Sequence, residues 1–182
     1  MMKPKHILVC GEVGVGKSTL VARLLAQSAM PVYGFVTKKL EADETGFHPI
    51  YIHRADTPQD ARVWTEENCI GTCNRRIHNI RLDTFNTLGV SYLSQAAPGG
   101  LIVMDELGFM EAKAERFVQA VFAALDGTIP VLAALKARYD VPFLNAVRAH
   151  QNATLYQITE DNRDALYEEL LPAIRGWAQG DA

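Results

Sequence analysis

Short apolar runs alternate with longer segments of helical periodicity along most of this chain. The apolar runs predict strands over residues 6–10, 32–40, 46–53, 101–104, 130–135 and 153–159. The periodic segments predict helices over residues 17–27, 83–97, 115–125, 143–150 and 162–178, with Asp83 as the N-cap of the second. Apolar strands separated by amphipathic helices are typical of an α/β fold with a largely parallel, buried sheet.

Two regions depart from this alternation. Residues 46–53 follow 32–40 across the polar, glycine-containing turn 41–46, which predicts an antiparallel hairpin. The pattern is unclear over residues 57–79, where 61–66 and 75–82 are compatible with further strands and 69–73 with a turn. We interpret this stretch as an insertion, because 182 residues without a linker or a repeat predict a single domain spanning 1–182.

Composition and charge narrow the classes of function. The net charge is −3 without a basic block or an acidic tail, so no nucleic-acid or protein partner is indicated. No stretch reaches the ~18 apolar residues that a membrane span requires. Gly11 and Glu12 interrupt the apolar start of the chain, which favours a first strand over a signal peptide. The odd, small set of three cysteines favours a reducing, cytoplasmic location.

The loop between the first strand and the first helix carries the strongest signal. Gly11, Gly16, Lys17 and Ser18 match the P-loop, or Walker A, pattern. Glycines there let backbone N–H groups converge on a phosphate chain, Lys17 reaches its β- and γ-phosphates, and the Ser18 hydroxyl binds Mg²⁺. The alternative is a glycine-rich strand-to-helix turn with an exposed lysine, but the full motif together with the strand before it and the helix after it favours phosphate binding. The predicted nucleotide-binding residues are Gly11, Glu12, Val13, Gly14, Val15, Gly16, Lys17, Ser18 and Thr19.

A second part of a nucleotide site follows the apolar strand 101–104. Asp105 has the position of a Walker B carboxylate, which supports Mg²⁺, and Glu106 is placed to activate an attacking water. Such a pair is also compatible with the start of a solvated loop, but the P-loop upstream favours hydrolysis. By analogy with glutamate-using ATPases, the pair predicts a RecA-like sheet with another strand between the P-loop strand and the Walker B strand. Glu106 and Lys17 are the predicted catalytic residues.

Four segments together resemble a small nucleoside-triphosphatase family known from thermophiles and, in humans, as the cancer-related nucleoside triphosphatase. They are "GEVGVGKSTL", "YGFVTKK" with "GFHPIYI", "IVMDELGFMEAKAERF" and "ITEDNRDAL". The resemblance covers most of the chain and implies a three-layer, RecA-like P-loop fold with a mainly parallel sheet and an added antiparallel hairpin. It also implies Mg²⁺-dependent hydrolysis of ATP, GTP or other nucleoside triphosphates to diphosphate and phosphate, with low base selectivity.

The resemblance assigns phosphate binding to residues 11–18, Mg²⁺ support to Asp105 and water activation to Glu106. The chain departs from the family pattern at Phe109, where a lysine is usual. It departs again at residues 37–47, which contain no arginine where that hairpin usually has one.

Weaker constellations leave alternatives open. Cys69, Cys73 and His78 have zinc-like spacing without an evident fourth ligand, and ordinary cytosolic thiols are the favoured interpretation. Arg163 is a candidate to bind a base or a phosphate, or it is a surface residue paired with Asp161 or Asp164. The aromatic residues Trp64, Tyr167 and Trp177 are compatible with a base pocket or, more commonly, with partial core.

Two further functions stay open. One is a phosphotransferase whose small acceptor binds at the irregular middle of the chain, including residues 75–83. The other is a nucleotide-dependent switch or adaptor that binds a protein or an RNA in one nucleotide state.

Overall fold

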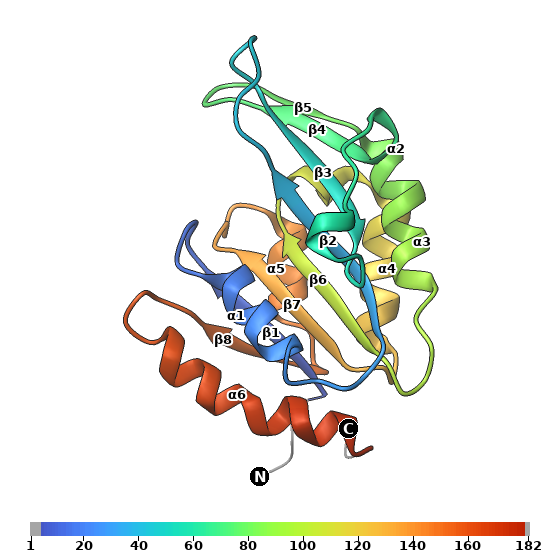
Figure 1. Cartoon of the computed structure of the whole chain (residues 1–182), viewed down its shortest axis with the longest axis vertical. Helices are drawn as coiled ribbons and strands as arrows, with labels where there is room; N and C mark the ends of the chain where they lie inside the picture. Colours follow the sequence, from blue (N-terminus) through green and yellow to red (C-terminus); the bar gives the residue numbers. More distant parts are fainter. Residues whose placement is uncertain (1–4, 181–182) are drawn as a thin grey trace.

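The computed structural model describes residues 5–180, and in that range eight strands form one continuous sheet (Figure 1). The strands are β1 (His6–Gly11), β2 (Val32–Lys39), β3 (His48–Arg54), β4 (Cys69–Cys73), β5 (His78–Ile80), β6 (Leu101–Leu107), β7 (Val131–Lys136) and β8 (Ala153–Gln157). The helices are α1 (Lys17–Leu25), α2 (Leu82–Thr84), α3 (Val90–Ser94), α4 (Glu115–Asp126), α5 (Pro142–Arg148) and α6 (Arg163–Ala178).

The sheet has a parallel part and an antiparallel extension. Its strand order is β5-β4-β3-β2-β6-β7-β1-β8. Strands β2, β6, β7, β1 and β8 are parallel neighbours, whereas β3, β4 and β5 are added antiparallel to the β2 side. Strand β7 lies between β1 and β6, so the strand order predicted from the Asp105–Glu106 pair is confirmed, and so is the predicted hairpin of β2 and β3.

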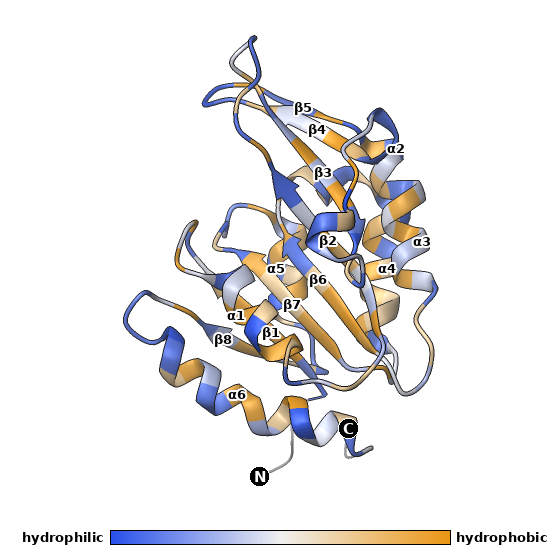
Figure 2. Cartoon of the chain, in the orientation of Figure 1, coloured by the Kyte–Doolittle hydropathy of each residue, from blue (hydrophilic) through white to orange (hydrophobic). Residues whose placement is uncertain are grey.

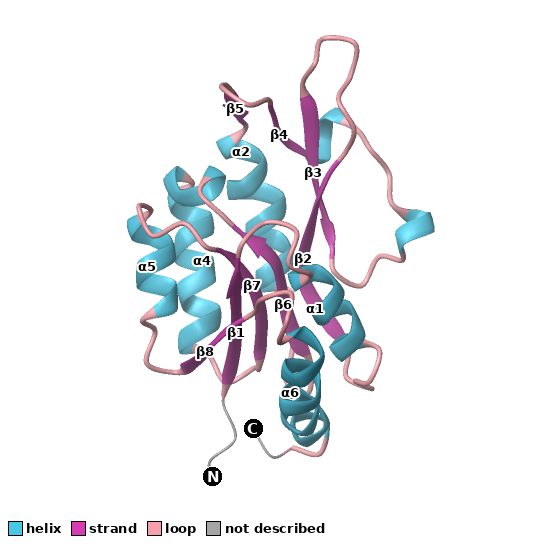
Figure 3. Cartoon of the chain, turned by 90° about the vertical axis from the view of Figure 1, so that its left-hand side faces the viewer, coloured by secondary structure: helices cyan, strands magenta, loops and turns pink. Residues whose placement is uncertain are grey.

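Alternation along the buried strands creates two cores. In β1, Ile7 and Val9 face the core formed with α1 and α6, whereas Leu8 and Cys10 face the core formed with α4 and α5. Figure 3 shows these two helical layers on opposite sides of the sheet. Both faces of the parallel strands are therefore covered, which is why β1, β6 and β7 are apolar along most of their length (Figure 2). The tip of the β2–β3 hairpin is hydrophilic in the same view.

The helical segment after β5 begins earlier than the sequence predicts. Helix α2, a π-helical turn at Phe85–Gly89 and helix α3 follow one another without a break. The N-cap is Arg81, so the prediction of Asp83 as N-cap is wrong: Asp83 lies inside the first turn. The reason is that the Arg81 N–H still bonds to the carbonyl of Ile70, so the chain passes from the sheet directly into the helix.

Residues 57–79 differ most from the sequence prediction. Residues 69–73 form strand β4 instead of a turn, only His78–Ile80 of the segment 75–82 is a strand, and 61–66 forms none. Instead, short 3₁₀ turns occupy Gln59–Ala61 and Glu66–Asn68. Asn68 holds this loop, since its Nδ2 donates to the carbonyl oxygens of Ile52 and Val63. Hydrogen bonds from the Asn68 side chain thus hold this loop in place of the backbone hydrogen bonds that a strand would have formed.

Within residues 5–180, none of the helices has the length and apolar character needed to cross a membrane.

Candidate active site

The loop that joins β1 to α1 has the conformation of an anion cradle. Gly14 and Gly16 have φ angles of 85° and 102°, which glycine adopts without strain. Within residues 5–180, the N–H groups of Gly14 and Gly16 donate to no protein acceptor. Those of Lys17, Ser18 and Thr19 have no helical acceptor either, because the first helical bond runs from the N–H of Leu20 to the carbonyl oxygen of Gly16. Free donors at a helix N-terminus, together with its partial positive charge, fit a phosphate.

The loop is packed tightly against β8. A Cβ atom added at Gly11 would lie 2.6 Å from the carbonyl oxygen of Ile158 and 3.0 Å from Val15 Cγ2. Val15 packs into the core beneath the loop, while Val13 is exposed at its tip. A cavity of about 270 Å³ lies over the loop and is lined by Val13, Gly14, Gly16, Lys17, Ser18, Thr19 and Glu106.

The side chain of Lys17 is buried and fully engaged by oxygen atoms. Its Nζ donates to the carbonyl oxygens of Gly11 and Glu12, each at 2.7 Å. Its Nζ also lies 3.2 Å from Oε2 of Glu106, at the end of β6. The loop lysine and the glutamate after Asp105 therefore meet directly, as the two sequence patterns require if they form one site.

Ser18 and Asp105 form a second contact between the loop and β6. Ser18 Oγ donates to Asp105 Oδ1 at 2.7 Å. Asp105 is 8% exposed, and this burial raises its pKa to about 6. The arrangement places a hydroxyl and a carboxylate oxygen together at the foot of the loop, and hard divalent cations prefer such oxygen ligands.

Sequence reasoning missed three residues of this region: Thr37, Lys136 and Glu111. Thr37 Oγ1, on β2, donates to the carbonyl oxygen of Asp105 and accepts from the backbone N–H of Glu106, each at 3.4 Å. The peptide bond between Asp105 and Glu106 is cis. Lys136, at the end of β7, places Nζ 3.5 Å from Oε1 of Glu106. Thr37 and Lys136 come from the two strands that neighbour β6, so only the strand order could have indicated these two residues.

Glu111 lies in the turn after β6 and is almost completely buried. It accepts a hydrogen bond from the N–H of Gly108, and burial raises its pKa to about 7. The carboxyl group therefore closes the turn that follows β6, just after Glu106. No motif marks this role in the sequence.

Arg163 begins α6 beside the P-loop. Its Cδ and Nη1 lie 3.6 Å from the position of a Cβ on Gly16. Neither acidic neighbour pairs with it in the described part of the chain, and Asp164 instead forms an ion pair with Arg23 at 2.7 Å. The guanidinium is thus placed over the loop, and its predicted contact with nucleotide stays a prediction.

The three aromatic residues considered for a base pocket lie apart. Trp177 is buried in the core with α1, Tyr167 packs under the Arg23 guanidinium, and Trp64 packs on Tyr51 and His53. Tyr167 and Trp177 lie ten residues apart on α6, and Trp64 lies in the loop between β3 and β4, so none of the pockets found among residues 5–180 is lined by the three together.

The cysteines of the irregular middle are buried free thiols. Among residues 5–180, no group of three or more His, Cys, Asp or Glu side chains is arranged to hold a metal ion. His78 instead packs edge-on against Phe109, with ring centroids 4.9 Å apart.

Comparison with known proteins decides the family. Residues 6–171 match the protein family described as NTPase. The chain belongs to the NTPase family. The resemblance inferred from the sequence motifs is thereby confirmed.

Relatives of this NTPase cover nearly all of it. The nucleoside-triphosphatase THEP1 of Aquifex aeolicus is 26% identical over 179 residues, which cover 92% of this chain and 98% of the relative. A cancer-related nucleoside-triphosphatase homolog of Mus musculus is 27% identical over 190 residues, covering 94% and 97%. The THEP1 of Methanosarcina barkeri is 30% identical over 167 residues, covering 88% and 92%.

The fold of this NTPase is also similar to a solved structure. The crystal structure of THEP1 from Aquifex aeolicus superimposes with a TM-score of 0.73 at 22% identity, covering 93% of this chain and 98% of that one. The predicted P-loop NTPase fold, mainly parallel with an antiparallel addition, is confirmed.

Proposed function

We propose that this NTPase is a Mg²⁺-dependent nucleoside triphosphatase that converts ATP, GTP and other nucleoside triphosphates to the diphosphate and inorganic phosphate. The observation that carries the proposal is the contact of Glu106 with Lys17, at 3.2 Å between Oε2 and Nζ. A triphosphate on the loop would present its γ-phosphate at Lys17 and hence beside a carboxylate. The names of the relatives, which are nucleoside-triphosphatases, support the same reaction.

Phosphate binding falls to the loop. Lys17 now satisfies its ammonium group with the carbonyl oxygens of Gly11 and Glu12. Phosphate oxygens carry more charge than carbonyl oxygens and form stronger, charge-assisted hydrogen bonds, so they would compete well for Lys17. The free N–H groups of the loop supply further donors to the same anion.

The donor set at the foot of the loop fits Mg²⁺. Ser18 Oγ and Asp105 Oδ1 are 2.7 Å apart, and Mg²⁺ commonly takes one or two protein oxygens together with substrate phosphates. Asp105 is a buried carboxyl group with a raised pKa, so a nearby cation would favour its ionised form. Ser18 and Asp105 would hold the ion, and its positive charge would help to neutralise the charge that develops on the phosphate oxygens.

Glu106 would act on the attacking water. The water oxygen bonds to the γ-phosphorus, the bond from phosphorus to the bridging oxygen breaks, and the diphosphate leaves with that oxygen. Glu106 accepts the proton that the water loses and returns it to solvent. Lys17 and Lys136 contact the two carboxylate oxygens separately, which orients the carboxylate for this role.

Recognition of the base is expected to be weak. In our proposal Arg163 stacks on the base or reaches a phosphate, and a planar guanidinium does either without selecting one base. We therefore expect ATP and GTP to be hydrolysed with similar kcat/KM.

The buried free thiols of Cys10, Cys69 and Cys73 support the expectation of a reducing, cytoplasmic setting. We also propose that residues 1–182 act as one domain.

The experiment is Glu106→Gln, which removes the carboxylate at nearly constant size. Phosphate release from ATP should fall by ~10² to 10⁴, the usual contribution of a general base. ATP affinity should stay within roughly threefold, because the loop holds the phosphates. Asp105→Asn should weaken both steps and raise the Mg²⁺ requirement.

Glu115→Gln, at the exposed start of α4, is the matched control and should hydrolyse ATP at the parental rate. If Glu106→Gln also does so, the proposed function is wrong. Transfer of phosphate to a metabolite without release of free phosphate would favour the phosphotransferase, and slow turnover with nucleotide-dependent capture of a partner would favour the switch.

A further inference from the structure

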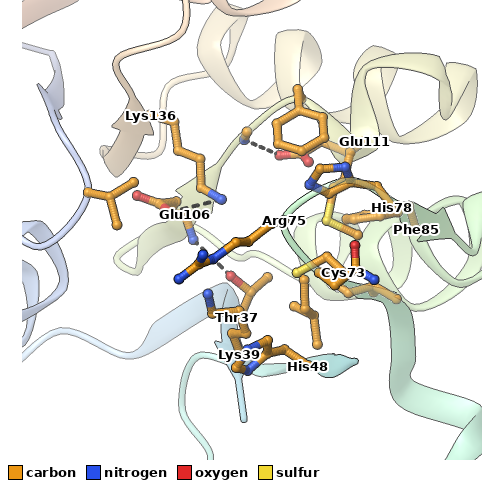
Figure 4. Close-up of a pocket in the computed structure, with 17 residues that line it drawn as sticks. Thr37, Lys39, His48, Cys73, Arg75, His78, Phe85, Glu106, Glu111 and Lys136 are labelled. Carbon is orange, nitrogen blue, oxygen red and sulfur yellow. Dashed lines mark hydrogen bonds and ion pairs between the residues drawn. The ribbon is translucent and has the colours of Figure 1, made fainter. Parts of the chain in front are cut away.

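A larger cavity, of about 540 Å³, adjoins the P-loop cavity (Figure 4). Val13 and Glu106 line both cavities, so the two spaces meet at the proposed catalytic carboxylate. We call the larger one the Glu106 side cavity. Its walls come from the β2–β3 hairpin, from β4 with the turn that follows it, from the segment after β6 and from the end of β7. Its volume is in the range of small-molecule sites.

The lining divides into an apolar part and a cationic part. Ile50, Ile70, Phe85, Phe109 and Met110 provide apolar and aromatic surface. The cations are Lys39 on β2, Arg75 in the β4–β5 turn and Lys136 on β7. In Figure 4, Arg75 extends across the cavity toward Thr37 and Glu106. An apolar body with one charged end would match this division.

The positive charges that line the Glu106 side cavity are only partly neutralised by acidic side chains of the protein. In the described part of the chain, Lys39 and Arg75 form no ion pair, and Lys136 pairs only with Glu106, at 3.5 Å. The other carboxyl group of the lining, Glu111, is turned to the N–H of Gly108. The cavity therefore presents an excess of positive charge beside apolar surface, which favours an organic anion over a cation or a neutral sugar.

We propose that the Glu106 side cavity binds a small organic anion, a phosphonate, phosphate or carboxylate group on an apolar or aromatic body, next to the nucleotide and not in its place. The charged group lies at Arg75 and Lys39, and the body packs on the apolar wall. This site is distinct from the P-loop, whose cations and N–H groups the nucleotide uses. Its occupant is a second ligand of the protein.

The probe is phenylphosphonate, which combines a charged group with an aromatic ring and resists hydrolysis. Calorimetry with the full chain, in the presence of a saturating non-hydrolysable ATP analogue, measures its binding while the P-loop is filled. We expect it to bind at least about tenfold more tightly than methylphosphonate, which lacks the ring, and benzyl alcohol, which lacks the charge.

Two neighbouring arginines provide a matched pair of variants. Arg75 lines the cavity, whereas Arg76, the next residue in the same exposed turn, does not. Arg75→Gln should weaken phenylphosphonate at least about tenfold, since it removes a charge-assisted contact, and Arg76→Gln should change it less than twofold. Both side chains are exposed, so both variants should keep the parental melting temperature.

Equal affinities in the two variants would overturn the proposal, and so would displacement of phenylphosphonate by the ATP analogue. Binding is measured without turnover, so the result is independent of the Glu106→Gln experiment. A negative result for anion binding in the Glu106 side cavity is thus distinguishable from a negative result for the proposed hydrolysis.

Discussion

Nζ of Lys17, at the start of α1, lies 3.2 Å from Oε2 of Glu106, near the end of β6. The contact exists because β1 and β6 are parallel and end at the same edge, with β7 between them. Lys17 is 5% exposed, so its charge is held by the two loop carbonyl oxygens and by this carboxylate. One contact thus joins the predicted phosphate-binding cation to the predicted water-activating group.

Lys17→Ala should weaken triphosphate binding far more than nucleoside binding. The ammonium contacts phosphate and not the base, and a hydrogen bond to a charged group is worth about 1.5–3 kcal/mol. We expect a loss of ten- to a hundredfold for ATP and less than threefold for adenosine. Titrations of both ligands measure this, with Lys38→Ala, at an exposed position near the end of β2, as control. Equal losses for ATP and adenosine would contradict the assignment of the loop to phosphate.

Lys136→Met should lower kcat by about fivefold and leave KM nearly unchanged. The side chains of Lys136 and Glu106 are 31% and 22% exposed, and a partly exposed ion pair contributes on the order of 1 kcal/mol. Its role is to position the carboxylate, so Lys136→Arg should restore most of the rate. Steady-state kinetics of phosphate release with all three proteins measures the effect. A KM change at constant kcat would instead indicate a direct contact with nucleotide.

Gly11→Ala should destabilise the protein by about 1–3 kcal/mol, the usual range for overpacking. The added Cβ would lie 2.6 Å from the backbone oxygen of Ile158, the residue after β8, whose N–H donates to the carbonyl oxygen of Cys10. Gly108→Ala is the control, because the nearest atom there is 3.2 Å away in the flexible side chain of Lys136. Urea unfolding measures both variants. Equal free energies of unfolding for Gly11→Ala and Gly108→Ala would contradict the prediction, because they would show that the backbone after β8 moves to accommodate the added methyl group.

The stability contribution of His6 should be lost in mild acid. Its Nδ1 accepts from the N–H of Val131 and its Nε2 lies 2.9 Å from the carbonyl oxygen of Leu125, which requires the neutral ring. Burial lowers the pKa of His6 from 6.5 to about 4. The unfolded chain therefore takes up a proton below pH 6.5 that the folded chain refuses until about pH 4.

Between these pH values the contribution of His6 to the free energy of unfolding should fall by at most about 1.4 kcal/mol per pH unit. His6→Gln removes the titration, and His78→Gln, at an exposed position, is the control. Urea unfolding from pH 4 to 7.5 should give a smaller acid-side loss for His6→Gln than for the parent. Parallel pH profiles of parent and variant would refute the role of His6.

The irregular middle of the chain shows where sequence patterns were insufficient. Strand β4 contains Gly71, and a Cβ there would lie 2.1 Å from the carbonyl oxygen of Asn79 on β5. The glycine allows close approach of two strands, whereas in the sequence it indicated a turn. Likewise, Lys136 follows an ordinary apolar strand, and nothing local relates it to Glu106.

The sequence by itself determined the elements whose pattern is local: the apolar strands, the amphipathic helices, the P-loop and the Walker B pair. Period-2 and period-3.6 alternation and the glycine spacing act within a few residues, so they can be read without the fold. Only the tertiary structure decided which strand ends meet. Strand order brings Thr37 and Lys136 to Glu106, and the antiparallel extension carries Arg75 to the Glu106 side cavity. These contacts depend on packing between residues far apart in the chain, which no local pattern encodes.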